Sequence, residues 1–183
     1  MVQETEARGP QVQTSTETLG LEPQHPRFAK PQRVAFVQSC WHRDVVEEAR
    51  VTFLREAKAR HITNIDVFEV PGSFEIPLHV QILAKTRRYT AIVAAGLVVE
   101  NKFIVETVIR ALMEVQLHTE VPVFSAVLAP EQFHETQFHE TNVRDDFFRK
   151  HFAAKGVEVA EACARTLLSL ERLRGQVAAG IVG

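Results

Sequence analysis

Glycine and cysteine are both scarce in this chain. Its 183 residues include 8 glycines and 2 cysteines, and the glycine share lies well below the roughly 7% of average proteins. This composition excludes a collagen-like chain, a low-complexity chain and a disulfide-rich scaffold. Cys40 and Cys163 belong to no Cys-x-x-Cys or Cys/His motif, so the sequence predicts neither a metal site nor a redox pair. We therefore expect a protein of the reducing cytoplasm.

The sequence also lacks long apolar runs and an excess of either charge. No segment reaches the ~20 consecutive apolar residues of a membrane span, and no basic segment followed by an apolar run opens the chain. We therefore expect neither a membrane partner nor a secretory signal. Because 21 basic residues face 23 acidic ones, no general attraction to nucleic acid is expected. No GxGxxG or P-loop motif is present, which argues against dinucleotide and nucleoside triphosphate sites.

Composition divides the chain into three segments. Residues 1–30 are rich in Gln, Thr, Glu and Pro and show no apolar period, so we expect a disordered N-terminal arm. Residues 175–183 are expected to form a C-terminal tail. The remaining segment, 31–174, has the length of one ordinary domain.

Within the domain, short apolar runs alternate with segments of helical periodicity. Four runs predict strands, at Val34–Val37, Ile65–Val70, Ala91–Ala95 and Val121–Leu128. Five segments with apolar residues three and four positions apart predict helices, at 44–57, 74–85, 103–117, 145–154 and 157–174. Such alternation implies right-handed crossovers and parallel strands. The expected fold is therefore α/β, a three-layer sandwich of a four-stranded parallel sheet with helices on both faces, flavodoxin-like.

The carboxyl end of the first strand carries candidate binding residues, because ligands of such sheets bind beyond the carboxyl ends of the strands. That strand ends in Ser39, Cys40, Trp41 and His42. Trp41, the only tryptophan, either stacks on a heterocyclic ligand or fills the core. Side chains of sequence neighbours point apart, which favours an unreactive Cys40 over a thiolate paired with His42.

The second predicted strand runs into the string VPGSFEIPL, Val70 to Leu78. Its Pro-Gly pair predicts a tight turn, and the helix start that follows exposes backbone N–H groups. Glu75 in the first turn is suited to bind the hydroxyls of a polyol. The alternative is an ordinary helix entry, in which Ser73 is the N-cap and Glu75 favours the helix dipole.

Together these segments resemble one family closely, the 6,7-dimethyl-8-ribityllumazine synthases, penultimate enzymes of riboflavin synthesis. The string VPGSFEIPL matches an uncommon string of that family, and the resemblance runs through Val34–Leu170. Trp-His after the first strand, Val115–Ser125 and His151–Gly156 resemble a branch found in some bacteria as a second, decameric type. In that branch Trp replaces the more usual Phe.

The resemblance implies a cofactor-free condensation of 5-amino-6-(D-ribitylamino)uracil with 3,4-dihydroxy-2-butanone 4-phosphate, in which phosphate and two waters are lost. It further implies a homo-oligomer, a pentamer or a decamer, with sites between subunits. Trp41 would then stack on the pyrimidine ring. Ser73, Phe74 and Glu75 would hold the ribityl chain.

The resemblance also assigns residues near the predicted last helix to the neighbouring subunit's site. Lys155, in the Lys-Gly pair expected to start that helix, matches a residue that family members contribute across the interface. Arg149 and His151 precede it and are expected to meet the substrate phosphate there. A solvated helix face explains this local cluster of basic residues equally well.

The segment after the third strand departs from the family pattern. Family members carry there a glycine-bearing loop that binds phosphate and holds a proton-transferring histidine, whereas no histidine occurs here between His79 and His118. Asn101 and Lys102 at the helix start either form a substitute phosphate site or belong to an ordinary solvated turn. A positioned acid or base typically contributes ~10²–10⁴-fold, so the departure predicts an impaired condensation.

A second departure follows the fourth strand, where QFHET is repeated in tandem within 132–141. His134 and His139 are five positions apart, unlike the HExxH spacing of a helical metal site, so no metal is expected. With His42 and His151, these two histidines are the candidates for proton transfer. The sequence does not choose among the four.

Two rival functions follow from the same features. A non-catalytic paralogue that binds a lumazine or flavin, or acts as an assembly scaffold, would keep Trp41 and Ser73–Glu75 and lack the histidine loop. A flavodoxin-like regulator is disfavoured, because the strand ends carry neither an acidic phosphorylation cluster nor a Ser/Thr-rich flavin phosphate loop.

Overall fold

The centre of the molecule is a single parallel sheet. The computed structural model describes residues 25–99, 102–129 and 141–182, with the backbone alone at 102 and 141–145. The strands are β1 (Arg33–Ser39), β2 (Asn64–Val70), β3 (Ala91–Leu97) and β4 (Val123–Leu128), in the order β2-β1-β3-β4. All three pairings are parallel. The two inner strands are covered on both faces, which explains why their sequences are apolar runs without alternation.

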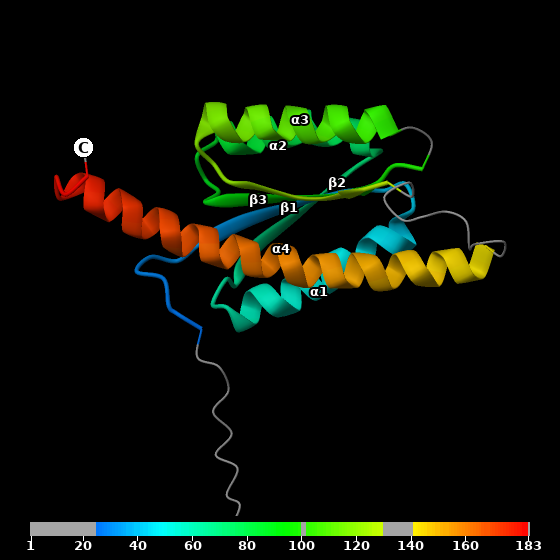
Figure 1. Ribbon diagram of the computed structural model, residues 1–183, viewed down its shortest axis with the longest axis horizontal. Helices are drawn as coiled ribbons and strands as arrows, with labels where there is room; N and C mark the ends of the chain where they lie inside the picture. Colours follow the sequence, from blue (N-terminus) through cyan, green and yellow to red (C-terminus); the bar gives the residue numbers. More distant parts are fainter. Residues whose placement is uncertain (1–24, 100–101, 130–140, 183) are drawn as a thin grey trace, which may run out of the picture.

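Helices cover both faces of this sheet. A 3₁₀ turn (η1, Ser73–Glu75) leads into α2 (Ile76–Lys85), and α2 and α3 (Lys102–Thr119) lie together on one face. The other face is covered by α1 (Arg43–Ala59) and α4 (Thr141–Ala178) (Figure 1). The predicted three-layer α/β sandwich of flavodoxin-like type is thereby confirmed.

Two apolar clusters, one on each face of the sheet, make up the core. Phe36, Phe53 and Phe152 are fully buried between the sheet and the α1/α4 layer. Ile76, Val80 and Ile92 are fully buried on the α2/α3 side. The sheet is thus fixed from both sides, and the ends of its strands are held in place relative to one another.

The prediction of two separate closing helices is wrong, because α4 is one continuous helix that includes Gly156. A Cβ placed on Gly156 would lie 2.4 Å from the carbonyl oxygen of Ala49 and 1.9 Å from Oγ1 of Thr52, both on α1. The glycine therefore marks the point where two helix backbones come closest, and it does not mark a helix end. Lys155 lies within this helix and not at its start.

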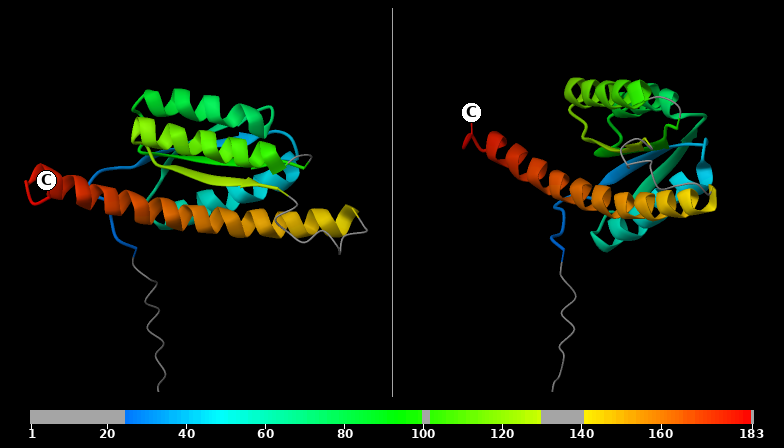
Figure 2. Two further views of the ribbon diagram at one scale, coloured as in Figure 1. Left: turned by 45° about the horizontal axis from the view of Figure 1, so that its top comes forward. Right: turned by 45° about the vertical axis from the view of Figure 1, so that its right-hand side comes forward.

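The described parts of the two expected terminal segments differ, because only the N-terminal one is seen to contact the domain. Phe28 packs against the core cluster below α1 and α4, and the N–H of Ala29 donates to the carboxylate of Glu171. Residues 1–24 of the expected arm lie outside the described residues. At the other end α4 continues through Gly175 to Ala178 and runs out past the sheet (Figure 2), so helix extends into the expected tail.

Candidate active site

Three chain segments meet at the carboxyl edge of the sheet, as expected for a parallel α/β fold. The segment after β1 is tied to the segment after β2, because the N–H groups of Cys40 and Trp41 donate to the carbonyls of Val70 and Pro71 at 2.8 and 3.2 Å. Beside this junction and the end of β3 lies a small pocket of about 110 Å³. Its described lining residues are Trp41, His42, Ser73, Phe74, Leu97, Val98, Val99 and Ile104.

Two aromatic side chains of this pocket are open to solvent. Trp41 and Phe74 are each 66% exposed, so the alternative that Trp41 fills the core is excluded. The indole ring lies against Gly72, where an added Cβ would be 3.0 Å from its Cε3 atom. Exposing two large apolar rings to water is unfavourable unless a ligand or partner covers them. The pocket therefore offers flat apolar surfaces suited to a planar ring.

Glu75 is part of the turn that closes β2. Its Oε2 accepts a hydrogen bond from the N–H of Gly72 at 2.9 Å, which satisfies one backbone donor of this helix entry. Both interpretations of Glu75 made from the sequence, a carboxylate that binds a polyol and a residue of the helix entry, are therefore compatible with the structure. The bond stabilises the turn and also fixes the direction of a carboxylate beside Phe74.

Ser73 lines the pocket, but its hydroxyl is buried. Oγ of Ser73 and Oγ of Ser39 find no hydrogen-bond partner among the described residues, and the two residues are 3% and 0% exposed. A Cβ on Gly96 would lie 2.3 Å from the Ser73 oxygen and 3.2 Å from the Ser39 oxygen. Gly96 therefore makes room for two hydroxyls beneath the pocket. Sequence reasoning missed Ser39 and Gly96, although both lie at predicted strand ends.

The end of the pocket nearest β3 is apolar where it is described. It is formed by Leu97, Val98, Val99 and Ile104, none of which was predicted as a site residue. For Leu97, Val98 and Val99, the position at the end of a buried strand was the signal that could have found them. Asn101 and the side chain of Lys102, the predicted substitute phosphate site, lie outside the described residues.

The predicted site residues of α4 lie away from this pocket within one chain. Arg149 pairs with Asp44 at 2.7 Å and with Glu48 at 3.6 Å, both on α1. Lys155 pairs with Glu158 at 2.5 Å. Neither Arg149 nor Lys155 is among the described residues that line the pocket, so one chain does not bring these cations into it.

The candidate histidines are separated in the same way. His42 lines the pocket, whereas His151 stacks on Phe147 within α4, with ring centroids 6.0 Å apart. Burial lowers the pKa of His151, and the positive charge of Lys155 lowers it further. His134 and His139, with the QFHET repeat, lie outside the described residues.

Neither cysteine belongs to a cluster with other potential metal ligands in the described part of the chain. Cys163 is buried, and burial raises the pKa of its thiol to about 12, so it has little nucleophilic character. Cys40 is exposed, with its Sγ 4.0 Å from Oε2 of Glu69.

Among the described helices, none is both long and apolar enough to cross a membrane.

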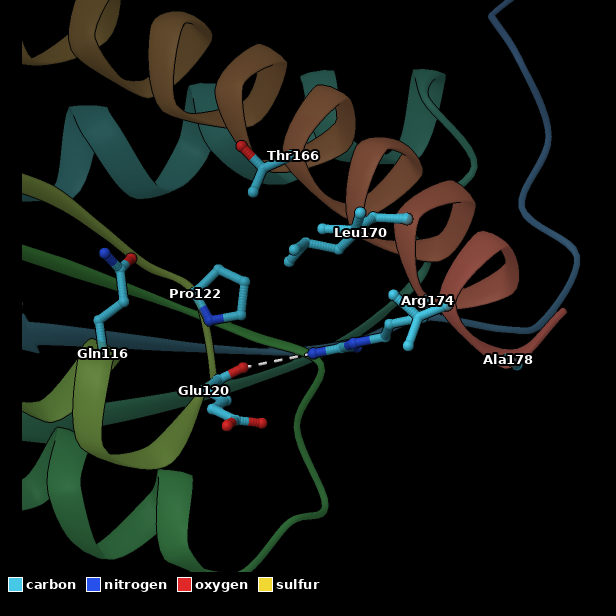
Figure 3. A pocket seen from close by; sticks show the side chains of 9 residues that line it. Gln116, Glu120, Pro122, Thr166, Leu170, Arg174 and Ala178 are labelled. Carbon is cyan, nitrogen blue, oxygen red and sulfur yellow. Dashed lines mark hydrogen bonds between the residues drawn. The ribbon is translucent and has the colours of Figure 1, made fainter. Parts of the chain in front are cut away.

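A larger hollow lies at the opposite edge of the sheet. It measures about 600 Å³ and is formed by the last turns of α4 and the connection from α3 to β4. Figure 3 shows Leu170 and Pro122 facing each other across it, and the guanidinium of Arg174 reaching the carbonyl of Glu120 at 3.4 Å. It contains neither of the two exposed aromatic rings of the carboxyl edge.

Comparison with known proteins agrees with the geometry of the carboxyl edge. The profile of the family described as 6,7-dimethyl-8-ribityllumazine synthase matches residues 31–171. The chain belongs to this family. Among its relatives, 6,7-dimethyl-8-ribityllumazine synthase 2 of Bradyrhizobium diazoefficiens is 76% identical over 163 residues, covering 86% of this chain and 96% of the relative. The family assignment made from the sequence is thereby confirmed.

Two further relatives of the lumazine synthase family carry the same name. The protein of Rhodopseudomonas palustris is 65% identical over 166 residues, with 88% of this chain and 89% of the relative covered. That of Pseudomonas syringae pv. tomato is 49% identical over 150 residues, with 78% and 85% covered. The family match over residues 31–171 includes every described residue that lines the pocket.

Proposed function

We propose that this chain catalyses the condensation of 5-amino-6-(D-ribitylamino)uracil with 3,4-dihydroxy-2-butanone 4-phosphate to 6,7-dimethyl-8-ribityllumazine, a step of riboflavin biosynthesis. Membership of the lumazine synthase family supports this activity. The observation that carries it is the pair of exposed rings, Trp41 and Phe74, at the carboxyl edge of the sheet. Holding both reactants side by side offsets the entropy that they lose on the way to the transition state. No metal or cofactor takes part in the proposed reaction.

In this proposal the pyrimidine ring stacks on Trp41, and the ribityl chain lies along Ser73, Phe74 and Glu75. The hydroxyl of Ser73 is buried and has no hydrogen-bond partner among the described residues, so a ribityl hydroxyl that reaches it would satisfy it. The free edge of the Glu75 carboxylate accepts hydrogen bonds from ribityl hydroxyls, while its Oε2 stays on Gly72. The phosphate group of the butanone substrate binds to Asn101 and Lys102, and to Arg149 and Lys155 of a second subunit.

The proposed site is shared between subunits of a homo-oligomer, a pentamer or a decamer. Arg149 and Lys155 are held by partly exposed ion pairs, which contribute little stability and are readily exchanged for a phosphate. The outer side of α2 and α3 exposes a set of large apolar residues that a second copy would cover, namely Leu78, Ile82, Ile109, Met113 and Leu117. Both free cysteines fit a reducing compartment, so we also propose a cytoplasmic location.

The activity is tested by mixing the purified full-length chain with both substrates and recording lumazine fluorescence. We expect a rate above the spontaneous reaction. Trp41→Ala should lower kcat/KM by at least ~10-fold, because stacking of a heterocycle on an aromatic ring contributes about 1–3 kcal/mol. Leu173→Ala, in the distant hollow, is the control and should leave the rate unchanged. A wild-type rate equal to the spontaneous rate would contradict the proposal.

Sharing of the site between subunits is tested by complementation. Trp41→Ala and Lys155→Ala each remove one side of the proposed site, and the two inactive variants are dissociated, mixed and reassembled. Mixed oligomers should regain activity, because some interfaces then combine an intact Trp41 with an intact Lys155. Absence of recovery, with mixed oligomers verified by mass spectrometry, would show that each chain uses its own Lys155 or none.

A second candidate function is a non-catalytic protein that binds the lumazine product or a flavin. The observation in its favour is the apolar end of the pocket, formed by Leu97, Val98 and Val99, in a chain without a histidine between His79 and His118. Quenching of Trp41 fluorescence by the product, together with no acceleration of its formation, would support this function over the enzyme.

A further inference from the structure

The described lining of the pocket contains one imidazole, the side-chain group that most often transfers protons in enzymes. Of its residues, Trp41 and Phe74 are aromatic, Ser73 offers a buried hydroxyl, and the residues from β3 and α3 are aliphatic. His42 is the exception. Its imidazole can donate from one nitrogen and accept at the other. Both His42 and Trp41 line the pocket, so the imidazole belongs to the same cavity as the ring that the pyrimidine is proposed to cover.

His42 occupies a backbone conformation that only a few per cent of residues other than glycine adopt. Its φ and ψ are 54° and 39°, in the left-handed region that favours glycine or asparagine. Hydrogen bonds on both sides of His42 hold this conformation. The N–H of Trp41 donates to the carbonyl of Pro71, and the N–H groups of Val45 and Val46 both donate to the His42 carbonyl at 3.0 Å. Because His61, Arg87 and Glu120 also have a positive φ, the conformation alone does not mark a functional residue. What distinguishes His42 is its place in the lining of the pocket.

The other described histidines are placed elsewhere. Nδ1 of His79 and Nδ1 of His118 each lie within 2.9 Å of a backbone carbonyl one turn earlier, on α2 and α3. His61 lies at the far end of α1, beside the start of β2, and shares the left-handed backbone with φ 64°. His61 is therefore a suitable control for His42. It is the same residue type, also has a left-handed backbone, and flanks the other end of α1, at the opposite edge of the sheet.

We propose that His42 is the acid/base residue of the first covalent step, an inference that rests on the proposed condensation. The 5-amino nitrogen forms a bond to the butanone carbonyl carbon, and the carbonyl π electrons move to oxygen. The imidazole of His42 twice takes a proton from that nitrogen and passes it to that oxygen. The C–O bond then breaks, the oxygen leaves as water, and the nitrogen lone pair completes the C=N bond. His42 ends in its starting form.

The test compares His42→Gly and His42→Asn with His61→Gly. Glycine and asparagine both tolerate a positive φ, so the two His42 variants should fold as the wild type does. Steady-state kinetics should show a fall in kcat of about 100-fold or more for both variants, with little change in KM. Added imidazole should restore part of the rate of His42→Gly by entering the space left open. His61→Gly should keep the wild-type kcat and show no response to imidazole.

The outcomes separate this inference from the proposed function. If the wild type is active and His42→Gly keeps kcat within about twofold, His42 is not the proton-transfer residue and the condensation stands. A rise in KM alone would assign His42 to binding and likewise overturn the inference. If the wild type binds the lumazine product but gives no rate above the spontaneous one, the proposed function fails, and the inference fails with it.

Discussion

The two faces of the sheet are covered to different degrees. On one face α1 and α4 pack so closely that Gly156 has no room for a side chain against Ala49 and Thr52. On the other face α2 and α3 bury their inner sides but leave large apolar residues open, with Leu78 and Leu117 at 60% and 70% exposure. The described part of the α1/α4 layer exposes few large apolar residues, whereas the α2/α3 layer exposes the set that a second copy is proposed to cover. The pocket opens at the carboxyl edge shared by both layers.

The strongest test of the close packing is Gly156→Ala. The added Cβ meets a backbone carbonyl of α1 that cannot turn away, so α4 must shift, and we expect a loss of about 1–3 kcal/mol in the free energy of unfolding. Gly175→Ala is the matched control in the same helix, because no atom lies within 4 Å of its Cβ. It should gain up to about 1 kcal/mol from helix propensity. Urea unfolding of both variants gives the two values, and equal signs would contradict the packing argument.

A smaller effect is expected on the α2/α3 face for Gly96→Ala. Here the nearest atom is the side-chain oxygen of Ser73, at 2.3 Å from the added Cβ, and a serine hydroxyl can be removed by mutation. We expect a loss of about 1–2 kcal/mol, which Ser73→Ala in the double variant should largely restore. Chemical unfolding of the two single variants and the double variant measures this coupling. Additive losses would show that the contact with Ser73 is not the cause.

The least effect on the folded chain itself is expected for Leu117→Lys. The side chain is already exposed on α3, so the free energy of unfolding of the dissociated chain should change by less than about 0.5 kcal/mol. Sedimentation should nevertheless show loss of the oligomer, because a charge would be buried at the proposed interface. Val51→Lys on α1, a residue of 50% exposure, should leave the oligomer intact. Dissociation by both variants would place interfaces on both faces and remove the contrast between them.

The sequence was sufficient to predict the sheet and much of the pocket. Apolar runs identified the two inner strands, β1 and β3, because strands covered on both faces need apolar residues at nearly every position. The edge strand β2 was also predicted, although most of its residues are not fully buried. The string from Val70 to Leu78 located the turn after β2, and the position of Trp41 after β1 located the exposed indole. These predictions succeeded because each depends on residues near one another in the chain.

The errors concern contacts between distant segments. Gly156 was interpreted as a break between helices, since local rules treat glycine as a helix end. Its actual role depends on Ala49 and Thr52, which no local pattern reveals. The same holds for Gly96 beneath Ser73, and for the left-handed backbone of His42, which is set by Pro71 and the start of α1. Whether Arg149 and Lys155 reach a site depends on a second chain.

The close packing of α1 and α4 also affects the order in which the chain folds during translation. Arg149 and Asp44, which join the two helices, are 105 positions apart. A chain emerging from the ribosome completes α1 long before its partner helix exists, so the residues of α1 that pack against α4 have no partner until the end of translation. Pairing over such a separation also slows folding. The core cluster between the sheet and the α1/α4 layer therefore stays incomplete until the last helix has been translated.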